Sequence, residues 1–288
     1  MSAANPTFSL LLVCPDRKGI VAAVAGFLSE HDASIVEAKQ FNDQLTHRFY
    51  MRAVFTAVGP KFVGIEQFRA EFSILAKSYE MTWQIEDCAR RVRVLIAVSK
   101  LGHCLQDLLY RWRSGVMPVD IVGVVSNHAD LRSLVEWHEV PFHHLPVSAE
   151  TRPRQEAALL ELFGKYQADL LVLARYMQIL SNDMCRAVSG RCINIHHSFL
   201  PSFKGARPYT QAYERGVKII GATAHIVTDD LDTGPIIAQN VIPVNHTHTA
   251  TAMVHAGRDV EKIVLAKAVK LMLEERVFLH GNRSIIFE

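Results

Sequence analysis

Polar side chains crowd the stretch that follows a predicted buried strand, from Ile193 to Gly205. Within it, Asn194 and His196 stand two residues apart, so on a strand their side chains share one face while Ile195 turns into the core. An amide can donate a hydrogen bond to a developing oxyanion, and an imidazole can exchange a proton near neutral pH. The pair suits attack on a carbonyl group. The alternative is that both residues only cap a strand end and bond to the backbone.

A second polar group lies in the turn Thr228–Pro235, which places Asp229, Asp230 and Asp232 between two β-rich runs. We expect this turn to be exposed. It is either a solvated hairpin turn that ends in Gly-Pro, or a site for a divalent cation. An EF-hand loop needs alternating oxygen ligands and a Glu at its twelfth position, which this turn does not supply.

His196, His197 and His225 allow a zinc interpretation, but their spacing disfavours it. Adjacent residues on a strand point to opposite faces, and the chain contains neither HExxH nor paired CxxC. We therefore expect no metal site.

The elements that must position these groups begin at about residue 91, where short apolar runs alternate with amphipathic stretches. This order predicts a doubly wound, mostly parallel α/β sheet, with the polar cluster beyond the carboxyl ends of its strands. The expected strands are 92–98, 119–125, 169–174 and 192–196, and the expected helices are 104–113, 130–138, 151–166 and 182–188. Two β-rich runs, 222–227 and 234–243, and a long helix over about 249–277 follow.

Residues 1–86 have a different pattern and predict a separate ferredoxin-like α+β domain in β-α-β-β-α-β order. Its expected strands are 7–13, 33–41, 48–55 and 81–85, and its expected helices are 19–30 and 61–78. Residues 87–91 are charged and form the predicted linker, which leaves 92–288 for the second domain.

Composition excludes several classes of protein. The length of 288 residues suits about two domains, and 31 Lys and Arg against 29 Asp and Glu leave no basic excess for nucleic acid. The apolar residues 8–14 lack a preceding basic segment, and no apolar run reaches about 18 residues, so we expect neither a signal peptide nor a membrane span. Five cysteines without a CxxC pair favour the cytoplasm.

The run Asn194–Pro201 followed by Asp232–Ile237 resembles the folate-dependent formyltransferase family, whose pattern is N-I-H-x-S-L-L-P and then D-x-G-x-I-I. The resemblance covers about residues 91–288, with Phe199 at a position where the family has Leu. It implies that Asn194, His196 and Asp232 are the catalytic groups. It also implies 10-formyltetrahydrofolate as the substrate and no prosthetic group.

The amino-terminal domain resembles the ACT regulatory domain in its topology and in the segment Cys14–Val21. That resemblance implies a homo-oligomer, either a dimer or a tetramer, and an amino-acid effector. The expected effector or contact site comprises Asp16, Arg17, Lys18, Gly19 and Ile20.

An ACT-like domain ahead of the formyltransferase-like domain is typical of the family branch that hydrolyses its substrate. Gly205–Gly216 and Gly257–Glu261 also resemble that branch. The segment Ser99–Cys104 has one glycine and bulky neighbours, so it suits a phosphorylated acceptor poorly. We expect hydrolysis of a linear amide C–N bond, which yields formate and tetrahydrofolate. The alternatives are formyl transfer to an amine and a non-catalytic amino-acid sensor.

The segment Arg175–Leu180 is the candidate slot for the flat pterin ring, with the Thr228–Asp232 loop over its other side. From the residues alone it could equally be a strand end that runs into a helix. Which of His196 and Asp232 is the formal base stays open, because a coupled pair shares its titration. The expected substrate-binding residues are Tyr176, Met177, Gln178, Ile179, Leu180, Thr228, Asp229, Asp230 and Gly234.

Overall fold

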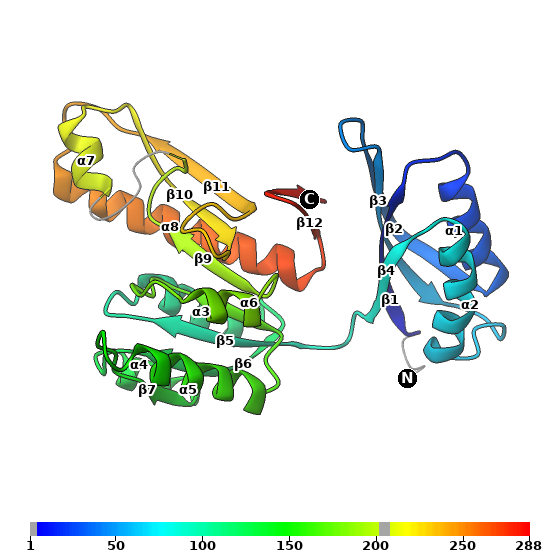
Figure 1. The fold of residues 1–288 in the computed structure, drawn as a ribbon, viewed down its shortest axis with the longest axis horizontal. Helices are drawn as coiled ribbons and strands as arrows, with labels where there is room; N and C mark the ends of the chain where they lie inside the picture. Colours follow the sequence, from blue (N-terminus) through cyan, green and yellow to red (C-terminus); the bar gives the residue numbers. More distant parts are fainter. Residues whose placement is uncertain (1–4, 202–207) are drawn as a thin grey trace. The chain divides into compact units, whose positions relative to one another are not determined.

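The amino-terminal unit is a four-stranded antiparallel sheet in the order β2-β3-β1-β4, with α1 and α2 on one side (Figure 1). The computed structural model describes residues 5–201 and 208–288. The unit contains β1 (Thr7–Pro15), α1 (Ile20–Glu30), β2 (Ala33–Asp43), β3 (Arg48–Ala57), α2 (Ile65–Ser78) and β4 (Thr82–Asp87). This confirms the ferredoxin-like order.

One apolar core holds this unit together. Leu10 and Leu12 alternate along β1 and face the sheet side on which Val24 of α1 and Phe68 and Phe72 of α2 pack. Burial of such side chains stabilises by roughly 1.5–3 kcal/mol each. The unit therefore has a core of its own, distinct from those of the residues that follow.

The second unit, Val92–Ile286, is built on a seven-stranded sheet in the order β11-β10-β9-β8-β5-β6-β7. The strands from β7 to β9 run parallel, and β10 and β11 are antiparallel to their neighbours. The elements are β5 (Val92–Val98), α3 (His103–Arg113), β6 (Val119–Ser126), α4 (Arg132–Trp137), β7 (Phe142–His144), α5 (Arg152–Lys165), β8 (Leu170–Leu173), α6 (Asn182–Ala187), β9 (Cys192–His196), α7 (Pro208–Glu214), β10 (Ile219–Ile226), β11 (Ile236–Pro243), α8 (Ala250–Leu273), β12 (Val277–His280) and β13 (Arg283–Ile286).

Both faces of this sheet are covered, as the continuous apolar runs predict. Along β5, Ile96 joins the core formed with α3 and α8, whereas Leu95 joins the core formed with α5 and α6. Figure 1 shows α8 running along the part of the sheet that contains β9 and β10. The prediction of a doubly wound, mostly parallel sheet is confirmed.

The carboxyl-terminal prediction was wrong in part. The long helix ends at Leu273, because Glu275 takes the left-handed conformation (φ 52°) and breaks the helical path. The apolar residues after it form the β12–β13 hairpin, which turns at Gly281 (φ 56°). The three-residue strand β7 and the short helix α7 were also missed, since neither is long enough to show a period. Residues 205–207 of the quoted resemblance lie outside the described residues.

Within residues 5–201 and 208–288, no helix is long and apolar enough to span a bilayer. The 24-residue α8 is charged along its length.

Candidate active site

The antiparallel pairing of β9 with β10 creates the centre of the site. It sets Asn194 opposite His225 and His196 opposite Thr223. The Nδ2 atom of Asn194 lies 3.2 Å from Nε2 of His225, within hydrogen-bonding distance. A bulge in the β10–β11 ladder between Ala224 and His225 shifts the register at this position. Bulges commonly re-aim a side chain beside an active site.

Asp232 reaches this pair from the loop between β10 and β11. Its Oδ2 lies 3.2 Å from Nδ1 of His196, and its Oδ1 lies 3.5 Å from Nε2 of His225. The Asp232 side chain is only 9% exposed, so the expectation of an exposed turn was wrong for this residue, although Asp229 and Asp230 are exposed. The Asp232 carboxylate is turned inward because it pairs with the imidazoles of His196 and His225.

The pKa of Asp232 reflects two opposing causes. Burial raises it, but the hydrogen bonds and charges of His196 and His225 outweigh burial and hold the pKa well below its usual range. Asp232 is therefore a carboxylate at every pH at which the protein would work.

His196 is oriented by that carboxylate. When Nδ1–H of its ring donates to Asp232, Nε2 carries a lone pair that can accept a proton. Nε2 is buried and has no hydrogen-bond partner among the described residues. A histidine held in this way through one nitrogen leaves the other for proton transfer with a bound molecule.

His225 was absent from the predicted catalytic set. Its Nδ1–H donates to the carbonyl oxygen of Ile226 at 2.9 Å, which fixes the ring while Nε2 faces Asn194 and Asp232. His225 is identified by the pairing of β9 with β10, which brings it next to Asn194 although the two residues are 31 positions apart in the chain. A single sequence does not reveal that pairing.

A pocket of about 340 Å³ adjoins these groups and is large enough for one small ring system. It brings together the predicted catalytic residues with eight of the nine predicted substrate-binding residues. The ninth, Gly234, does not line the pocket: a Cβ there would lie 1.9 Å from the carbonyl oxygen of Ile226, so the loop needs glycine to pack on that backbone. The lining residues are Leu173, Arg175, Tyr176, Met177, Gln178, Ile179, Leu180, Cys185, Asn194, Ile195, His196, His197, His225, Val227, Thr228, Asp229, Asp230, Leu231 and Asp232.

The segment after β8 forms one wall of the pocket and is fixed from behind. The Ser99 amide donates to the Arg175 carbonyl at 3.2 Å, and the Met177 amide donates to the Ser99 hydroxyl at 3.0 Å. The Tyr176 hydroxyl accepts from Gln155 at 2.7 Å, and burial raises the Tyr176 pKa to about 12. Met177 and Ile179 are more than half exposed, which leaves their side chains available for a ligand.

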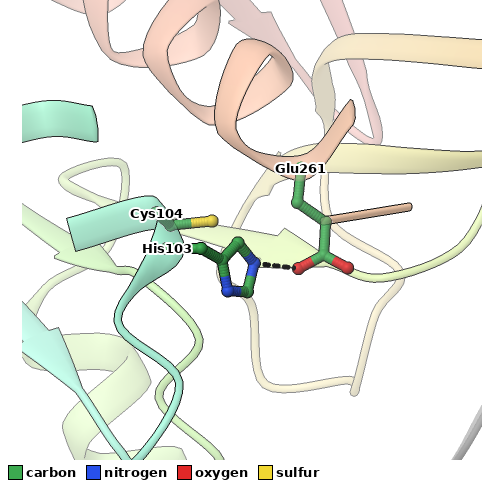
Figure 2. A group of neighbouring side chains, drawn as sticks. All are labelled: His103, Cys104 and Glu261. Atoms are coloured by element: carbon green, nitrogen blue, oxygen red, sulfur yellow. Dashed lines mark hydrogen bonds and ion pairs between the residues drawn. The ribbon is translucent and has the colours of Figure 1, made fainter. Parts of the chain in front are cut away.

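A third group of polar side chains joins α3 to α8. Figure 2 shows Glu261 of α8 pointing at His103, with Cys104 beside them. Among the residues that the structure describes, this trio alone has the spacing of metal ligands. Its donors are already engaged: His103 Nε2–H and the Tyr209 hydroxyl donate to the two Glu261 oxygens at 2.7 and 2.9 Å. Burial also raises the pKa of the Cys104 thiol, which keeps its proton.

The guanidinium of Arg175 completes this group, with Nε 3.4 Å from Glu261 Oε2. Its charge disfavours a metal cation there. Burial raises the pKa of Glu261, but His103, Arg175 and Tyr209 together lower it below its usual value. The group is a buried ion pair braced by hydrogen bonds.

The predicted effector loop lies in the amino-terminal unit. Asn42 donates to Asp16 at 2.6 Å, Arg17 pairs with Glu80 at 2.5 Å, and Gly19 has a φ of 96° just before α1. Asp16, Arg17, Lys18 and Gly19 are exposed, whereas Ile20 is 2% exposed and packs in the core. The Ile20 side chain is therefore unavailable to a ligand.

Two family models match the chain. Residues 92–269 match the formyl transferase family, and residues 8–61 match the ACT domain. Both matches fall where the sequence resemblance placed them.

Several proteins similar along almost the whole chain are named formyltetrahydrofolate deformylase. Formyltetrahydrofolate deformylase of Corynebacterium sp. (strain P-1) is 52% identical over 96% of both chains, and that of Escherichia coli K12 is 44% identical over 96% of this chain and 97% of its own. A solved formyltetrahydrofolate deformylase from Pseudomonas syringae pv. tomato has a TM-score of 0.95 at 47% identity, covering 100% of this chain and 96% of that one. Glycinamide ribonucleotide transformylase 1 from Symbiobacterium toebii is 32% identical, with a TM-score of 0.67 over 70% of this chain and 97% of its own.

The buried ion pair predicts the effect of Glu261→Gln. Loss of the charge leaves Arg175 uncompensated, and we expect the free energy of unfolding to fall by about 3 kcal/mol at neutral pH. Because the folded pKa of Glu261 is lowered, its contribution is present above the unfolded pKa and is lost as pH falls through the folded pKa. The gap between variant and wild type should therefore close in acid. Urea unfolding measures it, with Asp259→Asn, which removes an exposed ion pair on the same helix, as the control. Equal stability of the two variants would contradict the buried pair.

His197 gives a prediction that NMR can check. Burial, with the charges of Arg175 and His196, lowers its pKa to about 3. Its ring should therefore stay neutral from about pH 5 to 8, where an ordinary histidine titrates near 6.5. Carbon–proton correlation spectra of the imidazole groups would follow this, with His197→Asn to assign the signal. A titration midpoint near the ordinary value would show that the ring is solvated.

Proposed function

The chain belongs to the formyltetrahydrofolate deformylases of the formyl transferase family, and from that premise we propose that the pocket beside His196 hydrolyses 10-formyltetrahydrofolate. The products are formate and tetrahydrofolate, so the protein is a hydrolase acting on a linear C–N bond. The observation that carries the assignment of residues is the convergence of Asn194, His196 and Asp232 on one pocket wall.

Asn194 supports the first step. Water attacks the formyl carbon, and the carbonyl oxygen becomes an oxyanion. The Asn194 amide lies beside Nε2 of His225, at 3.2 Å from Nδ2, and its N–H groups can donate to that oxyanion. Fixing the amide beforehand means that it need not reorient as charge develops.

His196 and Asp232 divide the handling of protons. The low pKa of Asp232 makes it a weak base, so we assign proton transfer to Nε2 of His196. That nitrogen accepts a proton from the attacking water and returns one to N10 of the folate as the C–N bond breaks. Asp232 holds the ring orientation through Nδ1 and stabilises the imidazolium that forms between the two transfers.

The pterin ring of the folate binds between the segment after β8 and the β10–β11 loop. Met177, Gln178 and Ile179 of the first segment and Thr228–Asp230 of the loop all line the pocket. Backbone N–H and C=O groups of these segments match the hydrogen-bonding edge of a pterin, and the apolar side chains cover its flat face.

Formyl transfer to a phosphorylated amine fits the structure less well. A phosphate would use the N-terminus of α3, which begins at His103. There the ring of His103 is already bonded to the carboxylate of Glu261, and the segment Ser99–Cys104 has only one glycine to let backbone amides approach a phosphate. Water needs no such site.

We propose that the ACT domain assembles the protein as a homo-oligomer and binds an amino acid near Asp16–Gly19. The support for assembly is strand β2, which lies at the edge of its sheet and exposes Ile35, Val36 and Phe41. The support for an effector site is the exposed loop that turns at Gly19 into α1.

The compartment we propose is the cytoplasm. The support is that the five cysteines, at positions 14, 88, 104, 185 and 192, are not joined in disulfides within the described residues, as is usual where disulfides are kept reduced.

The reaction is tested with purified protein, 10-formyltetrahydrofolate and no amine acceptor. We expect formate and tetrahydrofolate in equal amounts. Asp232→Asn should lower kcat by at least about 10²-fold, because the amide cannot balance an imidazolium, while substrate affinity is largely kept. Asp130→Asn, an exposed acid outside the pocket, serves as the control. Full activity of Asp232→Asn would remove Asp232 from the mechanism, and the absence of any turnover by wild type would refute the proposed function.

Deletion of residues 1–86 tests the role of the amino-terminal domain. We expect the mass in solution, measured by light scattering, to fall from that of a dimer or tetramer toward that of one chain. Any response of the hydrolysis rate to a panel of the twenty amino acids should disappear with the domain. An unchanged oligomer would refute assembly through this domain, and an unchanged amino-acid response would refute the effector site.

A further inference from the structure

Arg175 is a buried cation in the wall of the active-site pocket that the mechanism above does not use. Its side chain is 9% exposed, and among the lining residues that the structure describes it is the only Arg or Lys. Nε and Nη1 have no hydrogen-bond partner among the residues described. A buried guanidinium with unused donors is costly, because its N–H groups give up water without replacement.

The backbone at Arg175 is also unusual. Its φ is +64°, the left-handed region that favours glycine, and a larger residue is seldom kept there without compensation. The carbonyl of Arg175 is held by the Ser99 amide at 3.2 Å, so the strain is fixed in place. Both the backbone and the side chain of this residue are therefore maintained at a cost in stability.

Within residues 5–201 and 208–288, the ion-pair partner of the guanidinium is Glu261. Oε2 of Glu261 lies 3.4 Å from Nε of Arg175. Glu261 is itself held by His103, as Figure 2 shows, and by the hydroxyl of Tyr209. This pair balances the charge, but the two hydrogens of Nη1 have no acceptor in the part of the chain that the structure describes. The contacts of Glu261 therefore explain how Arg175 is positioned. They do not explain what the N–H groups of Nη1 bind.

The chemistry of the reaction supplies an acceptor for those donors. Hydrolysis turns a neutral formamide into formate, so a negative charge arises in a pocket that already holds the Asp232 carboxylate. His197, which also lines the pocket, stays neutral because its pKa is lowered to about 3. Arg175 is therefore the lining group whose charge is always positive.

We propose that Arg175 forms a formate subsite in which Nη1–H donates to a carboxylate oxygen of the product. The formate oxygens are the former formyl oxygen and the oxygen of the attacking water; the C–N10 bond has broken and N10 has taken a proton. This subsite rests on the proposed function, since formate is the product of that hydrolysis. It makes Arg175 a product-binding residue in addition to the groups that carry the proton transfers.

The test measures the dissociation constant of ¹³C-labelled formate by NMR line broadening, on the full chain with tetrahydrofolate bound, together with formate inhibition of hydrolysis. Two variants are compared with wild type. Arg175→Gly suits the left-handed backbone and removes all donors, and Arg175→Lys keeps a charge to pair with Glu261. Arg132→Lys, an exposed arginine outside the pocket, is the matched control.

We expect formate binding to weaken about tenfold or more in Arg175→Gly, by less in Arg175→Lys, and not at all in Arg132→Lys. The inhibition constant for formate should rise by the same factors. If Arg175→Gly does not fold, the Arg175→Lys arm decides the question. Formate bound as tightly by the folded variants as by wild type, or not bound by wild type, would overturn the subsite.

The formate subsite and the proposed hydrolysis can be refuted independently of each other. Hydrolysis with formate binding that is indifferent to residue 175 would remove the subsite alone and leave Arg175 as a structural partner of Glu261. Formate binding that depends on Arg175 in a protein unable to hydrolyse 10-formyltetrahydrofolate would keep the anion subsite and remove the proposed function.

Discussion

The antiparallel contact between β9 and β10 is the constraint on which the site depends. The parallel part of the sheet ends at β9, and the reversed β10 sets His225 directly opposite Asn194. The chain then returns through the 227–235 loop to β11, and this return brings Asp232 over the imidazoles. The loop folds this tightly because Gly234 leaves room for the carbonyl of Ile226. One change of strand direction thus brings the Asn194 amide, the two imidazoles and the Asp232 carboxylate into contact with one another.

Periodicity was sufficient for the parts of this fold that depend on local pattern. The apolar strands β5, β6, β8 and β9 and the placing of Asn194 and His196 on one face follow from residue type and spacing. His225 does not, because its partner is set by a register across 31 residues. In the sequence, Glu261 is one of several charged residues on a long helix. Its burial depends on tertiary contacts, because His103 of α3 and Arg175 after β8 lie against it. The burial of Asp232 was misjudged for the same reason: three acids in a turn are typical of solvated surface, and only the tertiary structure distinguishes the one that faces inward.

Two buried carboxylates organise the electrostatics of the second unit in different ways. Asp232 faces groups that can gain and lose a proton, so its surroundings can follow a reaction. Glu261 faces Arg175, whose charge does not change, and Tyr209, whose burial raises its pKa so that it stays a hydrogen-bond donor. A buried ion pair seldom stabilises a fold more than apolar packing of the same volume would. The presence of Glu261 and Arg175 is therefore better explained by what they do at the pocket than by stability.

The cation in the pocket wall helps to explain why water, rather than an amine, accepts the formyl group. An amine in neutral water is largely in its ammonium form, and a fixed cation nearby repels that form. Water carries no charge and is not excluded in this way. In the subsite that we propose, the same cation would stabilise the formate that leaves. Asp232 pairs with the imidazole that moves protons, and Arg175 is the one Arg or Lys among the described lining residues, so the pocket holds a partner for each charge that hydrolysis creates, the imidazolium and the formate anion.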